Sequence, residues 1–103
     1  MAYKLKVTEL AERDLENIYD YISNRLANPT AASAFLDGVA ECYAKLAEMP
    51  MMFERCRDAQ LKERGYRRCV IKNYVMVYRV SVDEQCVYIL RYFYGARDYE
   101  KLI

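Results

Sequence analysis

The chain has 103 residues, of which 54% are hydrophobic and 30% are charged, and its formal net charge is +1. This composition is typical of a single folded domain over residues 1–103 and excludes a disordered chain. No apolar run approaches the roughly 20 residues that span a bilayer, and the amino-terminal segment lacks the apolar region of a secretory signal. We therefore expect a cytoplasmic protein that does not insert into a membrane.

The first 26 residues predict a strand followed by a helix. Residues 3–7 alternate apolar and charged side chains, as half-buried strands do. Thr8 is a candidate helix N-cap, and carboxylates follow it in the first turn, where they favour the positive end of the helix dipole. A continuous apolar stripe then recurs at helical spacing: Ala11, Leu15, Ile18, Ile22 and Leu26.

Asn28 and Pro29 predict the start of a second helix, with Asn28 as the N-cap and Pro29 at the first helical position. Apolar residues carry this helix to Met49-Pro50: Ala32, Phe35, Leu36, Val39, Tyr43 and Leu46. Two helices joined by so few residues form an antiparallel hairpin. Residues 51–65 show no clear period apart from a short turn of helix around 58–64, and loops of this length are often functional.

The last third of the chain predicts three short strands, at residues 66–72, 74–80 and 85–94. Tight turns join them at Asn73 and at Asp83-Glu84. The last strand is apolar on both faces, which predicts a central position in the sheet. The fold class is therefore α+β, in the order β-α-α-β-β-β, with a helical hairpin packed on one face of a mainly antiparallel four-stranded sheet.

Positive charge is concentrated in the second half of the chain. Residues 1–50 hold five basic and eight acidic residues, whereas residues 51–103 hold eleven and seven. Such asymmetry favours an anionic partner, and the alternative is a solvated basic face without a specific one. The candidate binding residues are Arg67, Arg68, Lys72, Arg79, Arg91, Tyr94 and Arg97. We expect them to converge on the sheet face that the helices leave uncovered, to clamp phosphates or to receive an acidic peptide.

Several kinds of site are missing from the sequence. The chain has no histidine, which excludes Ser-His and Cys-His nucleophilic pairs. Its four cysteines stand 14, 13 and 17 residues apart, a spacing that does not fit a zinc site. Cys42, Cys69 and Cys86 fall on predicted core elements, while Cys56 lies in a polar loop and is the candidate exposed thiol. We expect neither a metal nor another cofactor.

Residues along nearly the whole chain resemble one family pattern. The first helix carries Ala11, Asp14, Leu15, Ile18, Tyr21 and Ile22, and the second carries Ala32, Phe35, Val39, Leu46 and then Pro50. The longest stretch contains Gly65, Tyr66, Arg67, Arg68, Asn73, Tyr74, Tyr78, Arg79, Val80, Val87, Ile89, Leu90, Arg91, Gly95, Arg97 and Asp98. In order and spacing these residues resemble the RelE/ParE superfamily of toxins from bacterial type II toxin–antitoxin modules, of the plasmid-stabilisation type.

The resemblance implies a small growth inhibitor that is neutralised by a separately encoded antitoxin, whose extended segment wraps the toxin. A homodimer or a toxin–antitoxin hetero-oligomer is the assembly it suggests. RelE-like members are ribosome-dependent mRNA endoribonucleases, whereas ParE-like members poison DNA gyrase. For a nuclease, the candidate catalytic residues would be Arg67, Arg68, Lys72, Tyr94 and Arg97.

The chain departs from the nuclease pattern at several positions. Val75 stands where an arginine is usual, Phe93-Tyr94 lacks the histidine that some nucleases carry, and Ala59 replaces an acidic residue. Losing one preorganised charged group from such a site reduces the rate by about 10²–10³. The ParE-like branch is therefore favoured, although ParE-like chains also commonly carry arginine at the Val75 position. The alternatives are a RelE-like nuclease and an inactive relative that only binds antitoxin.

Overall fold

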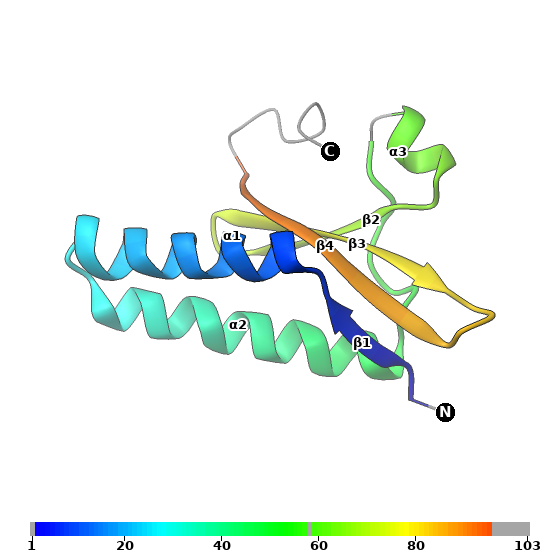
Figure 1. Cartoon of the computed structure of the whole chain (residues 1–103), viewed down its shortest axis with the longest axis horizontal. Helices are drawn as coiled ribbons and strands as arrows, with labels where there is room; N and C mark the ends of the chain where they lie inside the picture. The colour runs from blue at the N-terminus through cyan, green and yellow to red at the C-terminus, as the bar shows by residue number, and fades with distance from the viewer. Residues whose placement is uncertain (1, 58, 96–103) are drawn as a thin grey trace.

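A four-stranded sheet with two long antiparallel helices on one face forms the protein (Figure 1). This computed structural model describes residues 2–57 and 59–95. The elements are β1 (Lys4–Val7), α1 (Glu9–Asp20), the π-helical η1 (Tyr21–Arg25), α2 (Pro29–Glu48), α3 (Ala59–Glu63), β2 (Arg67–Ile71), β3 (Tyr74–Ser81) and β4 (Cys86–Tyr94). The strand order is β1-β4-β3-β2, with β1 parallel to β4 and the other pairs antiparallel. The predicted fold class, the central position of the last strand and the short helix before β2 are confirmed.

Both helix starts follow the predicted capping chemistry. The Thr8 hydroxyl oxygen accepts the N–H of Ala11 at 3.1 Å, and the same hydroxyl donates to the Leu90 carbonyl at 2.9 Å. Asn28 Oδ1 accepts the N–H of Ala31 at 3.0 Å, and Pro29 is the first residue of α2. The Thr8 contacts also join the start of α1 to β4.

The first helix does not continue regularly to Leu26, as the apolar stripe predicted. It changes at Tyr21 into η1, whose wider π-helical turn alters the rotation between successive residues. Ile22 stays buried, but Leu26 is 55% exposed. In α2, Leu36 is likewise exposed although the stripe placed it in the core. Within the described residues, no helix has both the length and the apolar character needed to cross a bilayer.

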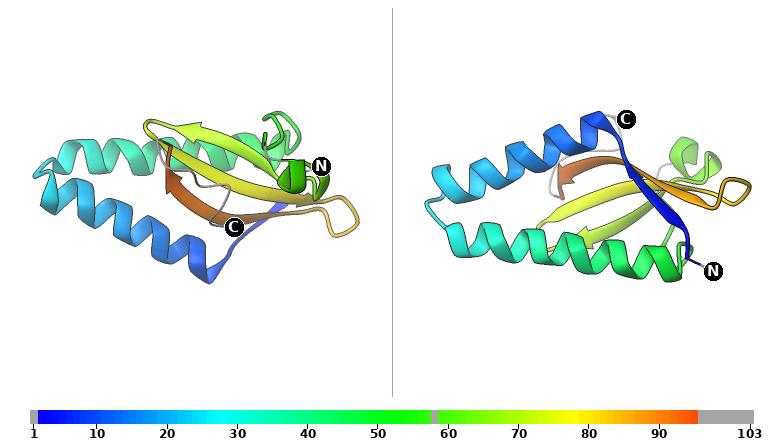
Figure 2. Two further views of the ribbon diagram at one scale, coloured as in Figure 1. Left: turned by 90° about the horizontal axis from the view of Figure 1, so that it is seen from above. Right: turned by 60° about the horizontal axis from the view of Figure 1, so that its bottom comes forward.

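The main core lies between the helical hairpin and the sheet, and Figure 2 shows the two helices lying along that face. Its largest fully buried side chains include Phe35, Leu46, Met76, Tyr78 and Ile89. Polar groups inside it are paired: Tyr78 donates to the carbonyl of Pro50 at 3.2 Å, and the Tyr43 and Tyr92 hydroxyls bond to each other. Along β3, the side chains of one face all contact this core: Tyr74, Met76, Tyr78 and Val80.

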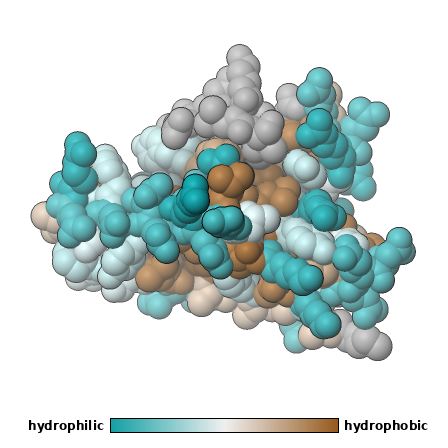
Figure 3. Space-filling view, viewed as in Figure 1, coloured by the Kyte–Doolittle hydropathy of each residue, from teal (hydrophilic) through white to brown (hydrophobic). Residues whose placement is uncertain are grey.

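A second apolar cluster covers the opposite face of the sheet. It consists of Cys56, Leu61, Val75, Val77 and Phe93. Because the segment before α3 folds back onto the sheet, Cys56 is 1% exposed, and the prediction that it is an exposed thiol is wrong. The other three cysteines are buried, as predicted. Figure 3 shows apolar side chains gathered at the middle of the molecule, bordered by polar ones along α1.

Asp14 of α1 closes part of the β4 edge. Strand β1 pairs with β4 only as far as Ile89, so the rest of β4 has no strand on that side. There the Asp14 carboxylate accepts the N–H of Tyr92 at 3.0 Å and two bonds from Arg91, at 2.7 and 3.2 Å. The Arg91 and Asp14 side chains are 26% and 15% exposed. The carboxylate thus replaces a neighbouring strand and joins α1 to the sheet.

We expect Asp14→Ala to lower the free energy of unfolding by about 2–4 kcal/mol, because it leaves a partly buried guanidinium and a strand N–H without their acceptor. The melting temperature should fall by on the order of 10 °C. The matched control is Arg13→Ala, which removes an exposed ion pair to Glu9 at 3.6 Å. That change should alter stability by less than about 0.5 kcal/mol. Equal melting curves for the two variants would contradict a structural role for Asp14.

Buried tyrosines predict a loss of stability at alkaline pH. Burial raises the pKa of Tyr78, Tyr43 and Tyr92 above the usual value of 10.0. As the pH rises, the unfolded chain therefore releases these protons before the folded chain does. The contribution of the three tyrosines to the free energy of unfolding is fully present below pH 10 and declines as the pH rises above it. Denaturant unfolding between pH 8 and 12, a range chosen to bracket that value, measures this decline. Tyr78→Phe should reduce the slope above pH 10, and an unchanged slope would contradict the assignment.

Candidate functional site

Strand β2 leaves part of the sheet edge open. Its first half is covered, because Arg68 N–H donates to the Glu54 carbonyl at 3.0 Å and Cys56 N–H donates to the Tyr66 carbonyl at 2.9 Å. Past this point, no described residue pairs with the outer side of β2. Since backbone groups alternate in direction along a strand, the N–H and carbonyl of Val70 point outward like those of Arg68. The Val70 side chain is 61% exposed.

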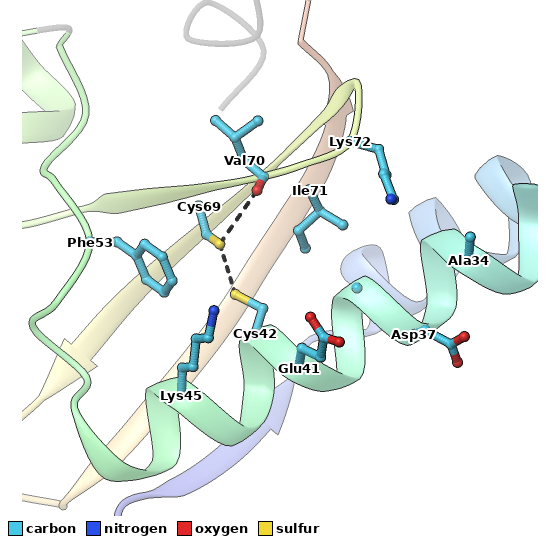
Figure 4. A pocket seen from close by; sticks show the side chains of 11 residues that line it. Ala34, Asp37, Glu41, Cys42, Lys45, Phe53, Cys69, Val70, Ile71 and Lys72 are labelled. Atoms are coloured by element: carbon cyan, nitrogen blue, oxygen red, sulfur yellow. Dashed lines mark hydrogen bonds between the residues drawn. The ribbon is translucent and has the colours of Figure 1, made fainter.

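A groove between α2 and β2 borders the helix side of this edge (Figure 4). We call it the α2–β2 groove; its volume is about 470 Å³. Polar side chains line it at Asp37, Glu41, Lys45 and Lys72, and apolar or thiol groups at Phe53, Cys42, Cys69, Val70 and Ile71. The groove therefore carries both charge signs beside a strand whose outward groups at Val70 have no backbone partner among the described residues; the Val70 carbonyl accepts only the Cys69 thiol, at 3.9 Å.

A second depression lies at the end of the β2–β3 hairpin. We call it the hairpin groove; its volume is about 300 Å³. It is lined by Arg68, Val70, Lys72, Asn73, Tyr74, Val75, Tyr94 and Gly95. Tyr94 is 47% exposed, and its ring centroid lies 5.7 Å from that of Tyr74. Gly95 N–H donates to the Asn73 carbonyl at 2.8 Å, which holds the end of β4 against the turn.

Three of the predicted site residues meet in the hairpin groove: Arg68, Lys72 and Tyr94. Lys72 is exposed, and it makes no ion pair with any residue in 2–57 or 59–95. Its φ of +57° places Lys72, and not Asn73, in the left-handed region that the turn requires. Lys72 also lines the α2–β2 groove, so it borders the open edge from both sides. Arg97 lies outside the described residues.

The expectation that these cations gather on the sheet face away from the helices does not hold for Arg67. Arg67 lies on the side of β2 that faces the helices, and it donates to the Phe53 carbonyl at 2.7 Å and to the Met51 carbonyl at 3.3 Å. It therefore holds the segment before α3 in place. The opposite face is not bare either, because the Cys56 and Leu61 cluster covers it.

Three further arginines are engaged within the protein. Arg68 bonds the Glu54 carboxylate at 2.6 Å, and this hydrogen bond lowers the pKa of Glu54. The Arg79 guanidinium lies 4.1 Å from the centroid of the Tyr88 ring. Arg91 bonds Asp14, and its guanidinium lies 4.8 Å from the Phe93 ring centroid. These positive charges mostly stabilise the fold, which reduces the charge available to an anionic partner.

Acid–base chemistry has few candidates at the hairpin groove. The chain has no histidine. Burial raises the pKa of Tyr74, which makes its hydroxyl a weaker acid than a free tyrosine. Across residues 2–57 and 59–95, no group of three or more carboxylates and thiols could hold a metal ion.

Sequence reasoning missed the structural partners of the arginines and the close approach of α2 to β2. Asp14 and Arg91 are 77 residues apart, so no local pattern pairs them. Gly38 was the available signal for the close approach: a Cβ built there would lie 2.9 Å from Ile71 Cγ2. Glycine in the middle of a helix is unfavourable, which indicates a close neighbour.

Solved structures with the same fold come from toxin–antitoxin complexes. The chain resembles a chain of the chromosomal ParDE system of P. aeruginosa at 23% identity and a TM-score of 0.69, covering 90% of this chain and 96% of that one. It also resembles a chain of the RelBE2 complex of Mycobacterium tuberculosis, with 22% identity and a TM-score of 0.64. That match covers 91% of this chain and 99% of the other. A chain of the RelE–RelB complex of Pyrococcus horikoshii matches with 17% identity and a TM-score of 0.64. That match covers 94% of this chain and 99% of the other.

Sequence comparison gives the family itself. No curated protein matches the chain. The model of the family described as the ParE toxin of the type II toxin–antitoxin system parDE matches residues 5–99, which is nearly the full length. Together with the shared fold, this match shows that the chain belongs to the ParE toxin family of type II toxin–antitoxin systems.

Proposed function

We propose that the protein is a growth-inhibiting toxin whose cognate antitoxin adds an extended segment to the open edge of β2. The observation that carries this proposal is the stretch around Val70, where a β-branched apolar side chain and outward backbone groups are exposed together. Open edges of this kind accept an added strand. The solved relatives are toxin–antitoxin complexes, which supports a protein partner of this kind.

The two grooves would divide the side chains of the added segment. Successive residues of a strand point to opposite faces, so alternate antitoxin side chains would enter the α2–β2 groove and the hairpin groove. On the hairpin side they would meet Lys72, whose charge favours acidic residues. On the helix side they would meet Lys45 as well as Asp37 and Glu41. We therefore expect an antitoxin segment with acidic residues on one face and mixed charge on the other.

Removing one outward N–H tests strand addition directly. Val70→Pro deletes this donor at an edge position where proline is tolerated, and should weaken antitoxin binding roughly tenfold or more, since a main-chain hydrogen bond contributes about 1 kcal/mol and the ring also restricts pairing. Val70→Thr is the matched control, because it keeps the N–H and the β-branched shape. Calorimetric titration with the product of the neighbouring gene measures both. Equal affinity of the proline variant and the wild type, with both folded, would contradict edge pairing.

Gyrase is the target that we favour for the free toxin. Arg67, Arg68 and Arg91, which an anionic substrate would require, bond acceptors within the protein. The histidine-free chain and the raised pKa of Tyr74 also favour inhibition by binding over hydrolysis. Membership of the ParE family supports the same action. The second candidate, cleavage of mRNA on the ribosome, is favoured by one observation: Arg68, Lys72 and Tyr94 line a single groove.

Purified toxin should inhibit supercoiling by DNA gyrase. Added antitoxin should restore supercoiling, because gyrase and antitoxin would compete for the same surface of the toxin. Messages from cells expressing the toxin should show no new codon-phased ends. Tyr94→Phe separates the two mechanisms: a general acid or base contributes about 10²–10⁴-fold to a rate, whereas a binding tyrosine that loses its hydroxyl changes inhibition only a few-fold.

The opposite results would decide against gyrase. Normal supercoiling at saturating toxin together with codon-phased cleavage that Tyr94→Phe abolishes would establish the nuclease. Normal supercoiling, intact messages and harmless expression would show an inactive relative that keeps only antitoxin binding.

A further inference from the structure

Two buried thiols face each other at the floor of the α2–β2 groove (Figure 4). The thiol of Cys42, on α2, donates to the sulfur of Cys69, on β2, with 2.8 Å between the two Sγ atoms. Each residue is 4% exposed, and both line the groove. A disulfide bond is about 2.05 Å long, so a shift of less than about 1 Å would bring the sulfurs to bonding distance.

The backbone around the two thiols keeps α2 close to β2. Gly38 lies one helical turn before Cys42, and Ile71 lies two residues after Cys69 on the same side of the strand. A Cβ on Gly38 would lie 2.9 Å from Ile71 Cγ2, so the helix approaches the strand as closely as glycine allows. The proximity of the thiols therefore follows from the packing of two elements and not from one side-chain rotamer.

We propose that Cys42 and Cys69 form a two-thiol redox site that a low-molecular-weight disulfide, such as oxidised glutathione, converts to an intramolecular disulfide. In the first step the Cys69 thiolate attacks one sulfur of the small disulfide, which forms a mixed disulfide and releases one small thiolate. The Cys42 sulfur then loses its proton to the released thiolate or to water and attacks Cys69 Sγ. The second small thiol leaves, so two protein thiols and one small disulfide become one protein disulfide and two small thiols.

The surroundings favour Cys69 as the attacking sulfur. The hydrogen bond from Cys42 lowers the pKa of Cys69; burial opposes this shift, and the positive charge of Lys45 adds to it. Lys45 lies on α2 and lines the same groove (Figure 4). A thiolate beside an ammonium group is the usual environment of a reactive cysteine. The groove offers the small disulfide a path to the two sulfurs.

The new bond would change a large part of the molecule. It would enclose the chain from Cys42 to Cys69, which includes the end of α2, the segment before α3, α3 itself and the start of β2. A loop of this length restricts the unfolded chain strongly, so oxidation should raise the melting temperature by on the order of 10 °C. The proposal does not depend on the antitoxin or on the toxin's target, because all its readouts use the isolated chain.

Oxidation of the folded full-length chain with oxidised glutathione tests the proposal. We expect two of the four thiols to disappear. Trypsin, which cleaves after lysine and arginine, should then give one peptide pair, residues 26–45 joined to residues 69–72, that dithiothreitol separates. The melting temperature should rise on oxidation and return on reduction. Cys86→Ala, which removes an equally buried thiol elsewhere, should leave the cross-link and the shift intact, whereas Cys42→Ala should abolish both.

Three results would overturn the proposal. They are glutathione adducts without the joined peptides, a disulfide that contains Cys56 or Cys86, and four unreacted thiols under conditions that oxidise the chain unfolded in denaturant. The peptide map of the wild-type chain decides among these outcomes even if the Cys42 variant does not fold.

Discussion

The fold depends on how the two edges of a small sheet are closed. At the β4 edge, the Asp14 carboxylate accepts a strand N–H and the Arg91 guanidinium where β1 has ended. This contact joins α1 to the sheet, whose two edge strands are β1 and β2. At β2, the segment with Glu54 and Cys56 covers only the first half, so the unpaired part is confined to the residues around Val70. Under the proposed function, a neutralising strand adds to this unpaired part of β2.

The arginines of the sheet show why a basic segment need not be a binding surface. Arg67 bonds main-chain carbonyls, Arg68 bonds Glu54, and Arg91 bonds Asp14. Each guanidinium joins a segment distant in sequence to the sheet, which a planar donor with several N–H groups does well. Among the described residues, Lys72 is the exposed cation that lines both grooves beside the open edge. This engagement of the arginines is one ground for the proposal that the toxin acts by binding a protein.

The contact between α2 and β2 serves several purposes at once. The absence of a side chain at Gly38 lets the helix approach Ile71, which shapes the α2–β2 groove and brings Cys42 against Cys69. The same approach leaves the outer side of β2 accessible, because α2 packs under the strand and not beside it. Antitoxin binding and the thiol reaction would then take place in the same groove, although each can be tested without the other.

The sequence by itself determined the elements and their order, because caps, turns and apolar periods are local signals. Thr8, Asn28 and Pro29 start the helices as predicted, and the last strand is central in the sheet. Only the tertiary structure decided which charges are free and which edge is open. Those properties depend on pairs such as Asp14 with Arg91, 77 residues apart, and on the folding back of Cys56. A pattern of neighbouring residues does not predict such contacts, because they form only when the helices and the sheet pack together.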